Sequence, residues 1–472
     1  MALKVGYKLN ELTLLRKWTR AGLPRKSSDL SNHANNSRHF GRLCVKAAIS
    51  AALAFGAISI GLLHAQTFPA EQAAPAQALI NTSGVVTHLT YTDTAYYTNW
   101  PGVLSAIQTL GVKHIRDGYG NYPSNSPLYA RHKQLASIGI TTDYVVPYNT
   151  STTAQAIEQF AANVTDMEAI EASNECDVSG VCGGTGTTGI NNAVSVLPSL
   201  HTAAQYLHVP LIGPSFANAT SYAVPGNIAS KMDLNNLHIY FGGRNPGSRG
   251  WGSPDALGNA YGSLNFWYDM AWEDAPLITP AVTETGYMSF PTTSTPYTLP
   301  ENVQTAYTQR TLLLDFTHGF QETFFYELMD DPTSPAGYGL LRSDMTEKPA
   351  FIGLSNMLQL LKDPGGNFTP GSLPLSISGG DSDLKHLLLQ KSDGSYWLAL
   401  WIEKPSWDPA KVAPIYVAPQ NIGIGLDNAH TTVKNYQFNS SGSYYTFDQP
   451  MNNGWAGLTV TDQISIIKIV AK

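Results

Sequence analysis

Polar side chains recur in this sequence directly after short apolar runs, where the strands of a parallel sheet would end. Two of them are carboxylic acids that could work as a pair: Glu175, in the segment IEASNECD, and Glu284, in AVTETGY, 109 residues further on. One such residue alone would be an ordinary loop residue, but chance does not easily explain a whole ring. The other members of this ring are His88, Arg116, Asp117, Tyr148, Asn149, Asn174, Ser215, His238, Tyr240, Tyr326 and Glu327.

At this ring the sequence resembles clan A of the glycoside hydrolases, over residues 85–361. Members of that clan carry an Asn-Glu pair at the end of the fourth barrel strand and a Glu at the end of the seventh. Here these are Asn174-Glu175 and Glu284. The segment YGLLRSDMTEKPAF, residues 338–351, also resembles a sequence segment that is common in such barrels. Many members have Pro after Asn-Glu, whereas Cys176 follows here, which leaves the subgroup open between family 39-like and family 5-like.

The resemblance implies a retaining glycosidase, in which two carboxyl groups lie roughly 5 Å apart on either side of one glycosidic bond. It assigns Glu284 as the nucleophile and Glu175 as the general acid and base. Asn174 would bind the sugar 2-hydroxyl, and the charge of Arg116 would keep Glu284 ionised.

The remaining ring residues are expected to bind substrate or to support the acids. By the same resemblance, His238 or Tyr240 would hydrogen-bond near the nucleophile. His88 and His238 could equally be core histidines, and Arg116-Asp117 could be an ion pair at the barrel mouth. Glu327 could contact the sugar or another site residue. The substrate-binding set is therefore His88, Arg116, Asp117, Asn174, His238, Tyr240, Trp251, Tyr326 and Glu327.

Aromatic residues gather in the same loops, and their faces suit the apolar C–H faces of sugar rings. Trp251, in the Gly-rich segment GGRNPGSRGWGSP, is the best candidate for an exposed stacking platform. The others are Tyr119, Tyr122, Tyr148, Tyr240, Phe241, Tyr287 and Tyr326.

The elements that must position these residues alternate as strand and helix, eight times in about 280 residues. The pattern predicts an α/β fold, a (β/α)8 TIM barrel over 83–362. A doubly wound open sheet is the alternative, but no Gly-rich phosphate loop follows the first strand. Strands are predicted at 85–89, 113–116, 142–146, 169–172, 210–213, 236–240, 277–283 and 322–326, and helices at 100–110, 126–138, 153–164, 191–207, 221–231, 255–271, 301–317 and 349–361.

From residue 363 the pattern changes to alternating strands with turn signals between them, which predicts a small all-β sandwich over 363–472. Its expected role is structural. A sugar-binding role would need exposed aromatic rings, and the candidates are Trp397, Trp401, Trp407 and Trp455.

Charge is distributed unevenly along the 472 residues. Residues 1–66 contain ten of the 28 basic and two of the 35 acidic residues, which leaves the rest of the chain with a net charge of −15. Nucleic acid is therefore not an expected partner. Charged residues make up only 13% of the chain, which suits a secreted protein that handles neutral carbohydrate.

The basic N-terminal segment is followed by the apolar run AAISAALAFGAISIGLL, residues 47–63. With Ala65 as a cleavage position, residues 1–66 are expected to be a signal peptide of a secreted or periplasmic protein. An uncleaved leader would instead anchor the chain in a membrane. The Ala- and Pro-rich residues 67–82 are predicted to be a linker.

Cys176 and Cys182 lie six residues apart and could pair in an oxidising compartment, or stay as two thiols. No CxxC or nearby His completes a zinc-ligand set, so no metal and no cofactor is expected.

Two other classes of function compete with the glycosidase. A barrel that binds carbohydrate without activity would not need both Glu175 and Glu284. A metal-dependent hydrolase would need clustered ligands such as HxH after the first strand, where Thr87-His88-Leu89-Thr90 offers one His.

Overall fold

The computed structural model describes residues 68–289, 297–332, 337–427 and 430–471. The described residues all belong to one compact unit. The predicted leader and its cleavage site at Ala65 lie outside the described residues. Within the described ranges, no helix combines the length and the apolar character needed to cross a bilayer.

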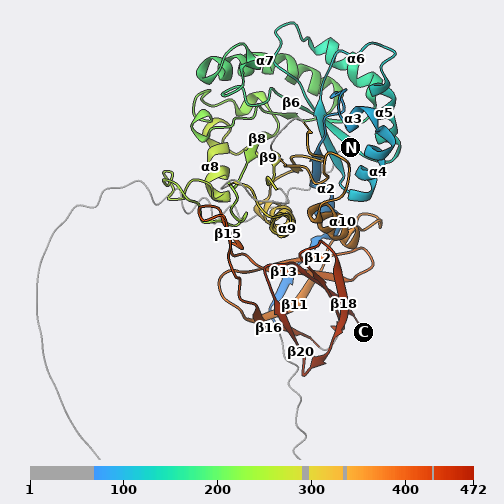
Figure 1. Ribbon diagram of the computed structural model, residues 1–472, viewed down its shortest axis with the longest axis vertical. Helices are drawn as coiled ribbons and strands as arrows, with labels where there is room; N and C mark the ends of the chain where they lie inside the picture. Colours follow the sequence, from blue (N-terminus) through green and yellow to red (C-terminus); the bar gives the residue numbers. More distant parts are fainter. Residues whose placement is uncertain (1–67, 290–296, 333–336, 428–429, 472) are drawn as a thin grey trace, which may run out of the picture. The chain divides into compact units, whose positions relative to one another are not determined.

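Eight parallel strands form one sheet, in the order β7-β6-β5-β4-β3-β10-β9-β8 (Figure 1). A parallel bridge from Ile212 to Leu234, just before β8, nearly closes this sheet into a barrel. The predicted barrel class is therefore confirmed. The strands are β3 (Ser83–Val86), β4 (His114–Gly118), β5 (Thr141–Val145), β6 (Met167–Glu171), β7 (Leu211–Ile212), β8 (Asn235–Ile239), β9 (Pro280–Thr285) and β10 (Thr323–Phe325).

Helices surround the sheet, and four of them begin with a side-chain cap. Asn99, Ser126, Thr153 and Ser263 each accept a hydrogen bond from a backbone N–H of the first turn, which satisfies a donor that the helix leaves unpaired. The helices are α2 (Ala76–Asn81), α3 (Ala95–Thr98), α4 (Trp100–Leu110), α5 (Pro127–Ser137), α6 (Ala154–Val164), α7 (Gly186–Leu207), α8 (Leu264–Asp274), α9 (Glu301–His318) and α10 (Pro349–Leu361).

The helix predicted over 221–231 is wrong. The structure has two short 3-10 helices in this region instead, Ala219–Ser221 and Ala229–Lys231. Pro225-Gly226 lies between them; Pro lacks the N–H that a continuing helix needs, and Gly226 has a φ of 63°.

The helix predicted over 255–271 starts late, at Leu264. Gly258 and Gly262 have φ values of 88° and 89°, in the left-handed region that helical residues do not adopt. The periodic apolar pattern before Leu264 therefore belongs to a loop.

The C-terminal part is the predicted sandwich of two antiparallel sheets, and this class is confirmed as well. Trp397, Trp401 and Trp407 are buried, so these three rings belong to packing rather than to an exposed sugar site. One sheet has the order β1-β11-β16-β20-β19 and the other β18-β17-β21-β13-β12-β2. The strands are β11 (Ser372–Gly379), β12 (Leu384–Gln390), β13 (Tyr396–Ile402), β16 (Gln420–Leu426), β17 (His430–Phe438), β18 (Tyr444–Gln449), β19 (Met451–Asn452), β20 (Trp455–Val460) and β21 (Ser465–Ala471), beside the ribbon of β14 (Trp407–Asp408) and β15 (Ala413–Pro414).

The linker predicted over 67–82 is wrong. Strand β1 (Ala70–Gln72) pairs antiparallel with β11, and β2 (Ala74–Pro75) pairs parallel with β12. Helix α2 follows at once. The small side chains of Ala73 and Ala76 are buried there, so the Ala-rich composition reflects close packing. The chain thus contributes to both sandwich sheets before it enters the barrel.

Helix α9 is largely polar in sequence and buried along most of its length. Arg310 donates to the carbonyls of Ile402 and Lys404 in the sandwich, at 2.9 and 3.1 Å. Gln304 donates to a barrel carbonyl at 2.9 Å. Polar groups buried between two layers must find partners, and the two bonds of Arg310 join the barrel to the sandwich.

Candidate active site

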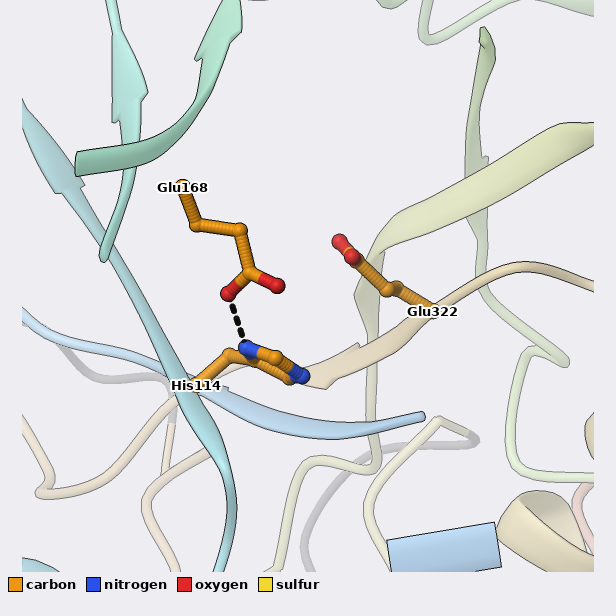
Figure 2. A group of neighbouring side chains, drawn as sticks. All are labelled: His114, Glu168 and Glu322. Carbon is orange, nitrogen blue, oxygen red and sulfur yellow. Dashed lines mark ion pairs between the residues drawn. The ribbon is translucent and has the colours of Figure 1, made fainter. Parts of the chain in front are cut away.

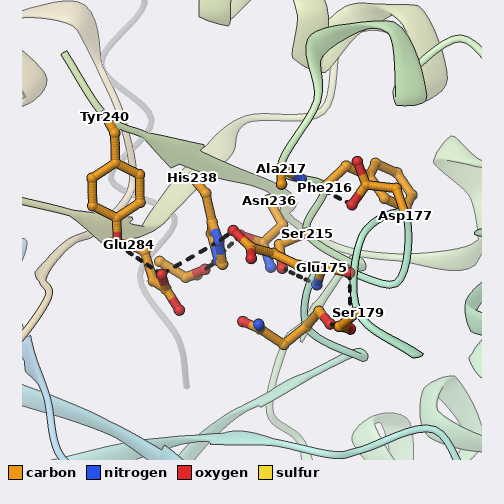
Figure 3. A network of polar contacts seen from close by, with 12 residues as sticks. Glu175, Asp177, Ser179, Ser215, Phe216, Ala217, Asn236, His238, Tyr240 and Glu284 are labelled. Carbon is orange, nitrogen blue, oxygen red and sulfur yellow. Dashed lines mark hydrogen bonds and ion pairs between the residues drawn. The ribbon is translucent and has the colours of Figure 1, made fainter. Parts of the chain in front are cut away.

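The two glutamates singled out in the sequence lie together at the carboxyl ends of β6 and β9. Figure 3 shows Glu175 and Glu284 on either side of His238, with Tyr240 beside Glu284. Carboxylate oxygens of the two glutamates and a ring nitrogen of His238 all lie within 4.8 Å of one another. In a barrel of this kind, the carboxyl ends of the strands are where side chains from different strands converge.

A β-bulge at Thr283 aims the end of strand β9. Val282 pairs with Leu237 of β8, but the next β8 residue, His238, pairs with Glu284, so Thr283 has no counterpart. A bulge breaks the alternation of side chains between the two faces of a strand. As a result Thr283 and Glu284, although adjacent, both bind groups inside the barrel.

Glu284 accepts two strong hydrogen bonds. Arg116 Nη1 lies 2.7 Å from its Oε1, and the Tyr240 hydroxyl lies 2.8 Å from its Oε2. Burial alone would raise the pKa of Glu284, but the charges of His238 and Arg116 and the bond from Tyr240 outweigh it and lower the pKa. Glu284 is therefore held as a carboxylate, the form that a nucleophile needs.

Arg116 is fixed from behind by Glu171, a residue that the sequence reasoning missed. Glu171 has no exposed surface, and its carboxylate accepts bonds from Arg116 Nε and Nη2 at 2.6 and 2.8 Å. Arg116 Nη2 also donates to Asn174 Oδ1 at 2.7 Å. The available signal was the presence of two acidic residues, Glu168 and Glu171, in the strand segment MEAIEA, which is apolar at its other positions.

A second missed acid, Asp143, lies behind this pair on β5. Burial and the neighbouring carboxylate of Glu171 raise the pKa of Asp143 well above its ordinary value. These effects favour the protonated form of Asp143, while the carboxylates of Glu171 and Glu284 both pair with Arg116.

His238 lies between the two glutamates. Its Nδ1 is 2.8 Å from Glu175 Oε1 and 3.5 Å from Glu284 Oε2, and its Nε2 is 3.2 Å from Thr283 Oγ1. Burial would lower the pKa of His238, but the Glu284 charge and the hydrogen bond to Glu175 outweigh it and raise the pKa. A protonated ring could donate to Glu175 and Thr283 together, which would orient the Glu175 carboxyl.

Glu175 follows β6 in a constrained turn. Its φ is 45°, in the left-handed region that residues with side chains rarely adopt, and its backbone N–H donates to Ser215 Oγ at 3.2 Å. The next residue, Cys176, forms a disulfide with Cys182, with the two Cα atoms 5.4 Å apart. The side chain of Glu175 is 25% exposed, so solvent or a ligand can reach it.

His88, Tyr326 and Glu327 form a separate part of the mouth, at the ends of β3 and β10. His88 Nε2 lies 3.3 Å from Glu327 Oε2, and the ring of Tyr326 packs edge-on against His88 at 5.8 Å between centroids. Burial raises the pKa of Glu327, and His88 offsets only part of that shift. This pair does not touch Glu175 or Glu284 among the described contacts.

Asp117 is not open to a ligand. It is 3% exposed, and its carboxylate accepts bonds from Thr87 Oγ1, from the Leu89 N–H and from the Gly118 N–H at 2.5, 3.0 and 2.7 Å. We therefore assign Asp117 to the structure of the loop after β3, and not to substrate binding or to an ion pair with its neighbour Arg116.

Trp251 lines a pocket of about 340 Å³ beside the acid pair. The guanidinium of Arg244 lies 4.3 Å from its ring centroid, and Tyr261 packs edge-on against it. Tyr240, which binds Glu284, lies in the same lining. The pocket is therefore connected to Glu284 through Tyr240. Its other lining residues are Gly242, Gly243, Gly286, Tyr287, Met288, Tyr297 and Tyr338.

Two groups of side chains among the described residues have the donor types that hold metal ions. One is the trio of Glu175, His238 and Glu284, and the other lies elsewhere in the barrel. At the trio, the cation of Arg116 already occupies one oxygen of Glu284, and the Tyr240 hydroxyl occupies the other. This arrangement favours acid–base and nucleophilic chemistry over metal binding.

The sequence matches no family model and no curated protein, but solved structures share its fold. A glucosidase from Croceicoccus marinus is 12% identical with a TM-score of 0.54, covering 86% of this chain and 98% of that one. A 4-O-α-L-rhamnosyl-β-D-glucuronidase from Fusarium oxysporum 12S is 12% identical with a TM-score of 0.52, over 85% and 99%. A bifunctional glucanase-xylanase from a metagenome library is 9% identical with a TM-score of 0.50, over 85% and 97%. At these identities the likeness is one of fold, and the family 39-like or family 5-like subgroup stays a prediction.

Proposed function

We propose that this chain is a retaining glycoside hydrolase that acts on a carbohydrate substrate, with Glu284 as nucleophile and Glu175 as general acid and base. The observation that carries the proposal is the closeness of the two carboxyl groups, since one oxygen of Glu175 and one of Glu284 lie within 4.8 Å of each other. Retaining enzymes hold this pair at ~5 Å, whereas inverting enzymes leave ~6.5–9.5 Å for a water molecule. The glycosidases that share the fold support the reaction class.

In the proposed reaction, ionised Glu284 attacks the anomeric carbon while Glu175 gives its proton to the departing oxygen. The glycosidic bond breaks and an ester to Glu284 forms. Glu175, now a carboxylate, takes a proton from water, which attacks the same carbon and releases Glu284. Asn174, held by Arg116 at 2.7 Å, would bind the sugar beside the reacting carbon. Secretion through the basic and apolar leader is part of the proposal.

The test is the stereochemistry of the first product, followed by NMR on a glycoside that the wild-type protein hydrolyses. We expect the product to appear first in the anomeric configuration of the substrate. Glu284→Ala should remove nearly all turnover, and azide or formate should restore part of it with inverted configuration. A first product of inverted configuration from the wild type would refute the retaining mechanism. An unchanged rate in Glu284→Ala would refute the nucleophile assignment.

A further inference from the structure

Two carboxyl groups and one imidazole ring meet at the opposite end of the barrel from the active site. His114 is the first residue of β4, Glu168 the second residue of β6, and Glu322 directly precedes β10. One ligand atom from each lies within 4.8 Å of the other two. Figure 2 shows both carboxyl groups turned toward the His114 ring, with an ion pair from His114 Nδ1 to Glu168.

A second β-bulge turns Glu168 toward this cluster. Met167 pairs with Thr142 of β5, and Ala169 pairs with the next residue, Asp143, so Glu168 is the extra residue. Met167 packs in the same hydrophobic cluster as Ile170, and the bulge between them leaves Glu168 as an extra residue in the strand. Bulges often re-aim a side chain in this way, and are usually features with a purpose.

The His114 ring is oriented as in many metal ligands. Its Nε2 lies 2.7 Å from the carbonyl oxygen of Asn81, which can only accept, so Nε2 carries the hydrogen. The other nitrogen, Nδ1, faces Glu168, and Thr141 Oγ1 lies 2.8 Å from it. A ligating histidine typically donates its second N–H to a carbonyl or carboxylate in this manner, which fixes the ring and its tautomer.

Glu322 is the unexplained member of the cluster. It is 7% exposed, and within the described part of the chain its carboxyl group makes no hydrogen bond and no ion pair, although Figure 2 shows it aimed at His114 and Glu168. A buried carboxyl group without a partner is costly. Two carboxyl groups and one imidazole nitrogen thus face one another here, a set of donors that a divalent cation can hold.

We propose that His114 Nδ1, Glu168 and Glu322 bind a divalent transition-metal cation of the zinc class. One imidazole nitrogen and two carboxylate oxygens are ligands that Zn²⁺ accepts at about 2.0–2.2 Å, with water in a fourth tetrahedral position. The ion replaces the proton between His114 and Glu168, and the side chains adjust by about 1 Å. The side chain of Glu168 is 31% exposed, which leaves an entry path.

The role of this ion is structural. It links β4, β6 and β10, which are not adjacent in the sheet, at the end of the barrel where residues serve stability and not catalysis. Lys113, next to His114, donates to the carbonyl of Gly139.

The experiment measures metal content and melting temperature, so its outcome does not depend on the proposed glycosidase activity. Purified secreted protein is stripped with EDTA, dialysed against micromolar Zn²⁺ and then against metal-free buffer, and analysed by mass spectrometry for zinc. We expect one equivalent per chain, and a Tm that rises by several degrees with zinc. Glu322→Gln and Glu168→Gln should lose both. If Glu322→Gln does not fold, the more exposed Glu168→Gln decides.

Two control variants locate the ion. Asp274→Asn changes a buried carboxyl group on α8, outside the cluster, and should keep the zinc equivalent and the Tm response. Glu175→Gln changes the trio at the mouth and should keep them as well. Wild-type protein that retains no zinc and does not change its Tm would overturn the proposal. Zinc retained in Glu322→Gln and Glu168→Gln, or lost only in Glu175→Gln, would also overturn it.

Discussion

Glu171 accepts two hydrogen bonds from the guanidinium of Arg116, at 2.6 and 2.8 Å, with neither residue open to solvent. This paired geometry leaves Nη1 of the same guanidinium for Glu284. Breaking a buried ion pair by removing one partner typically costs ~3–5 kcal/mol. The position of the proposed nucleophile therefore depends on an acid that does not touch the substrate site.

Arg116→Gln should move the acidic limb of the kcat/KM profile to higher pH. The acidic limb reports ionisation of the nucleophile in the free enzyme. Two positive charges, those of His238 and Arg116, lower the pKa of Glu284, and the variant keeps only the charge of His238. We expect a shift of about one pH unit or more. The measurement is kcat/KM from pH 3 to 8 on an activated glycoside.

Arg116→Lys is the matched control, because lysine keeps the positive charge but lacks the planar guanidinium with its several N–H donors. Its acidic limb should stay nearer to that of the wild type while kcat/KM falls by about 10–10²-fold, since one ammonium cannot bind Glu171, Glu284 and Asn174 together. Equal limbs in the wild type and Arg116→Gln would show that this charge does not control ionisation.

Tyr240→Phe removes the 2.8 Å hydroxyl donor to Glu284 and little else. A hydrogen bond to a charged group contributes ~1.5–3 kcal/mol, so kcat/KM should fall by about 10–10²-fold, with the acidic limb again at higher pH. Tyr338→Phe serves as control, because its ring packs 5.6 Å from Tyr240 between centroids and should leave the limb in place. A limb shift in Tyr338→Phe but not in Tyr240→Phe would reverse the assignment.

The barrel was predictable because its strands and helices follow one another with clear apolar periods. Helices α4 and α10 have the predicted bounds. The strands within residues 67–82 were not predictable from local sequence, because they pair with residues some 300 positions away. Strands β11 and β16 carry Gly and Ser at many positions, such as Gly423 and Gly425, which weakens the alternation of apolar and polar residues that predicts a strand.

The two glutamates could be placed because each lies at the carboxyl end of a predicted strand, but the residues behind them could not. Glu171 and Asn236, whose amide donates to Glu171 at 3.0 Å, lie in strands, where the expected side chain is apolar. The cluster of His114, Glu168 and Glu322 has no local spacing at all, because its members come from three strands and one depends on a bulge. Local motifs such as HxH or CxxC cannot detect a site of that kind.

Asp315→Asn should stabilise the protein at high pH. Asp315 on α9 is buried, and burial raises its pKa to about 8. An acid whose folded pKa is raised contributes most stability when protonated, so stability falls as pH rises from about 4 through 8. The variant should lose this dependence and gain on the order of a few kcal/mol at pH 9, read as Tm from pH 5 to 9. The control Asp381→Asn, at an exposed position, should give no such gain. If the Tm of Asp315→Asn changed with pH in parallel with that of the wild type, the titration of Asp315 would not control this pH dependence.

Glu175→Ala should slow substrates according to their leaving groups. Aglycones that leave poorly, such as alkyl groups or sugars, need protonation, and their turnover should fall by about 10²–10⁴-fold. Dinitrophenyl glycosides need none, so they should still form the ester to Glu284, and azide should then give a glycosyl azide of retained configuration. The measurement is kcat/KM across a series of aglycone pKa values, where the variant should show a much steeper dependence.

Asp177→Ala separates this chemistry from a displaced loop. Asp177 lies two residues after Glu175 and accepts bonds from the Ala217 and Asn218 N–H groups, the Asn218 amide and Ser221 Oγ, at 2.8–3.0 Å. Its loss should loosen the loop, lower Tm and slow all leaving groups by the same factor, because its oxygens are already occupied. If Glu175→Ala also slowed every substrate equally, Glu175 would not be the general acid. Glu327, whose pKa burial raises, would then be the residue to test.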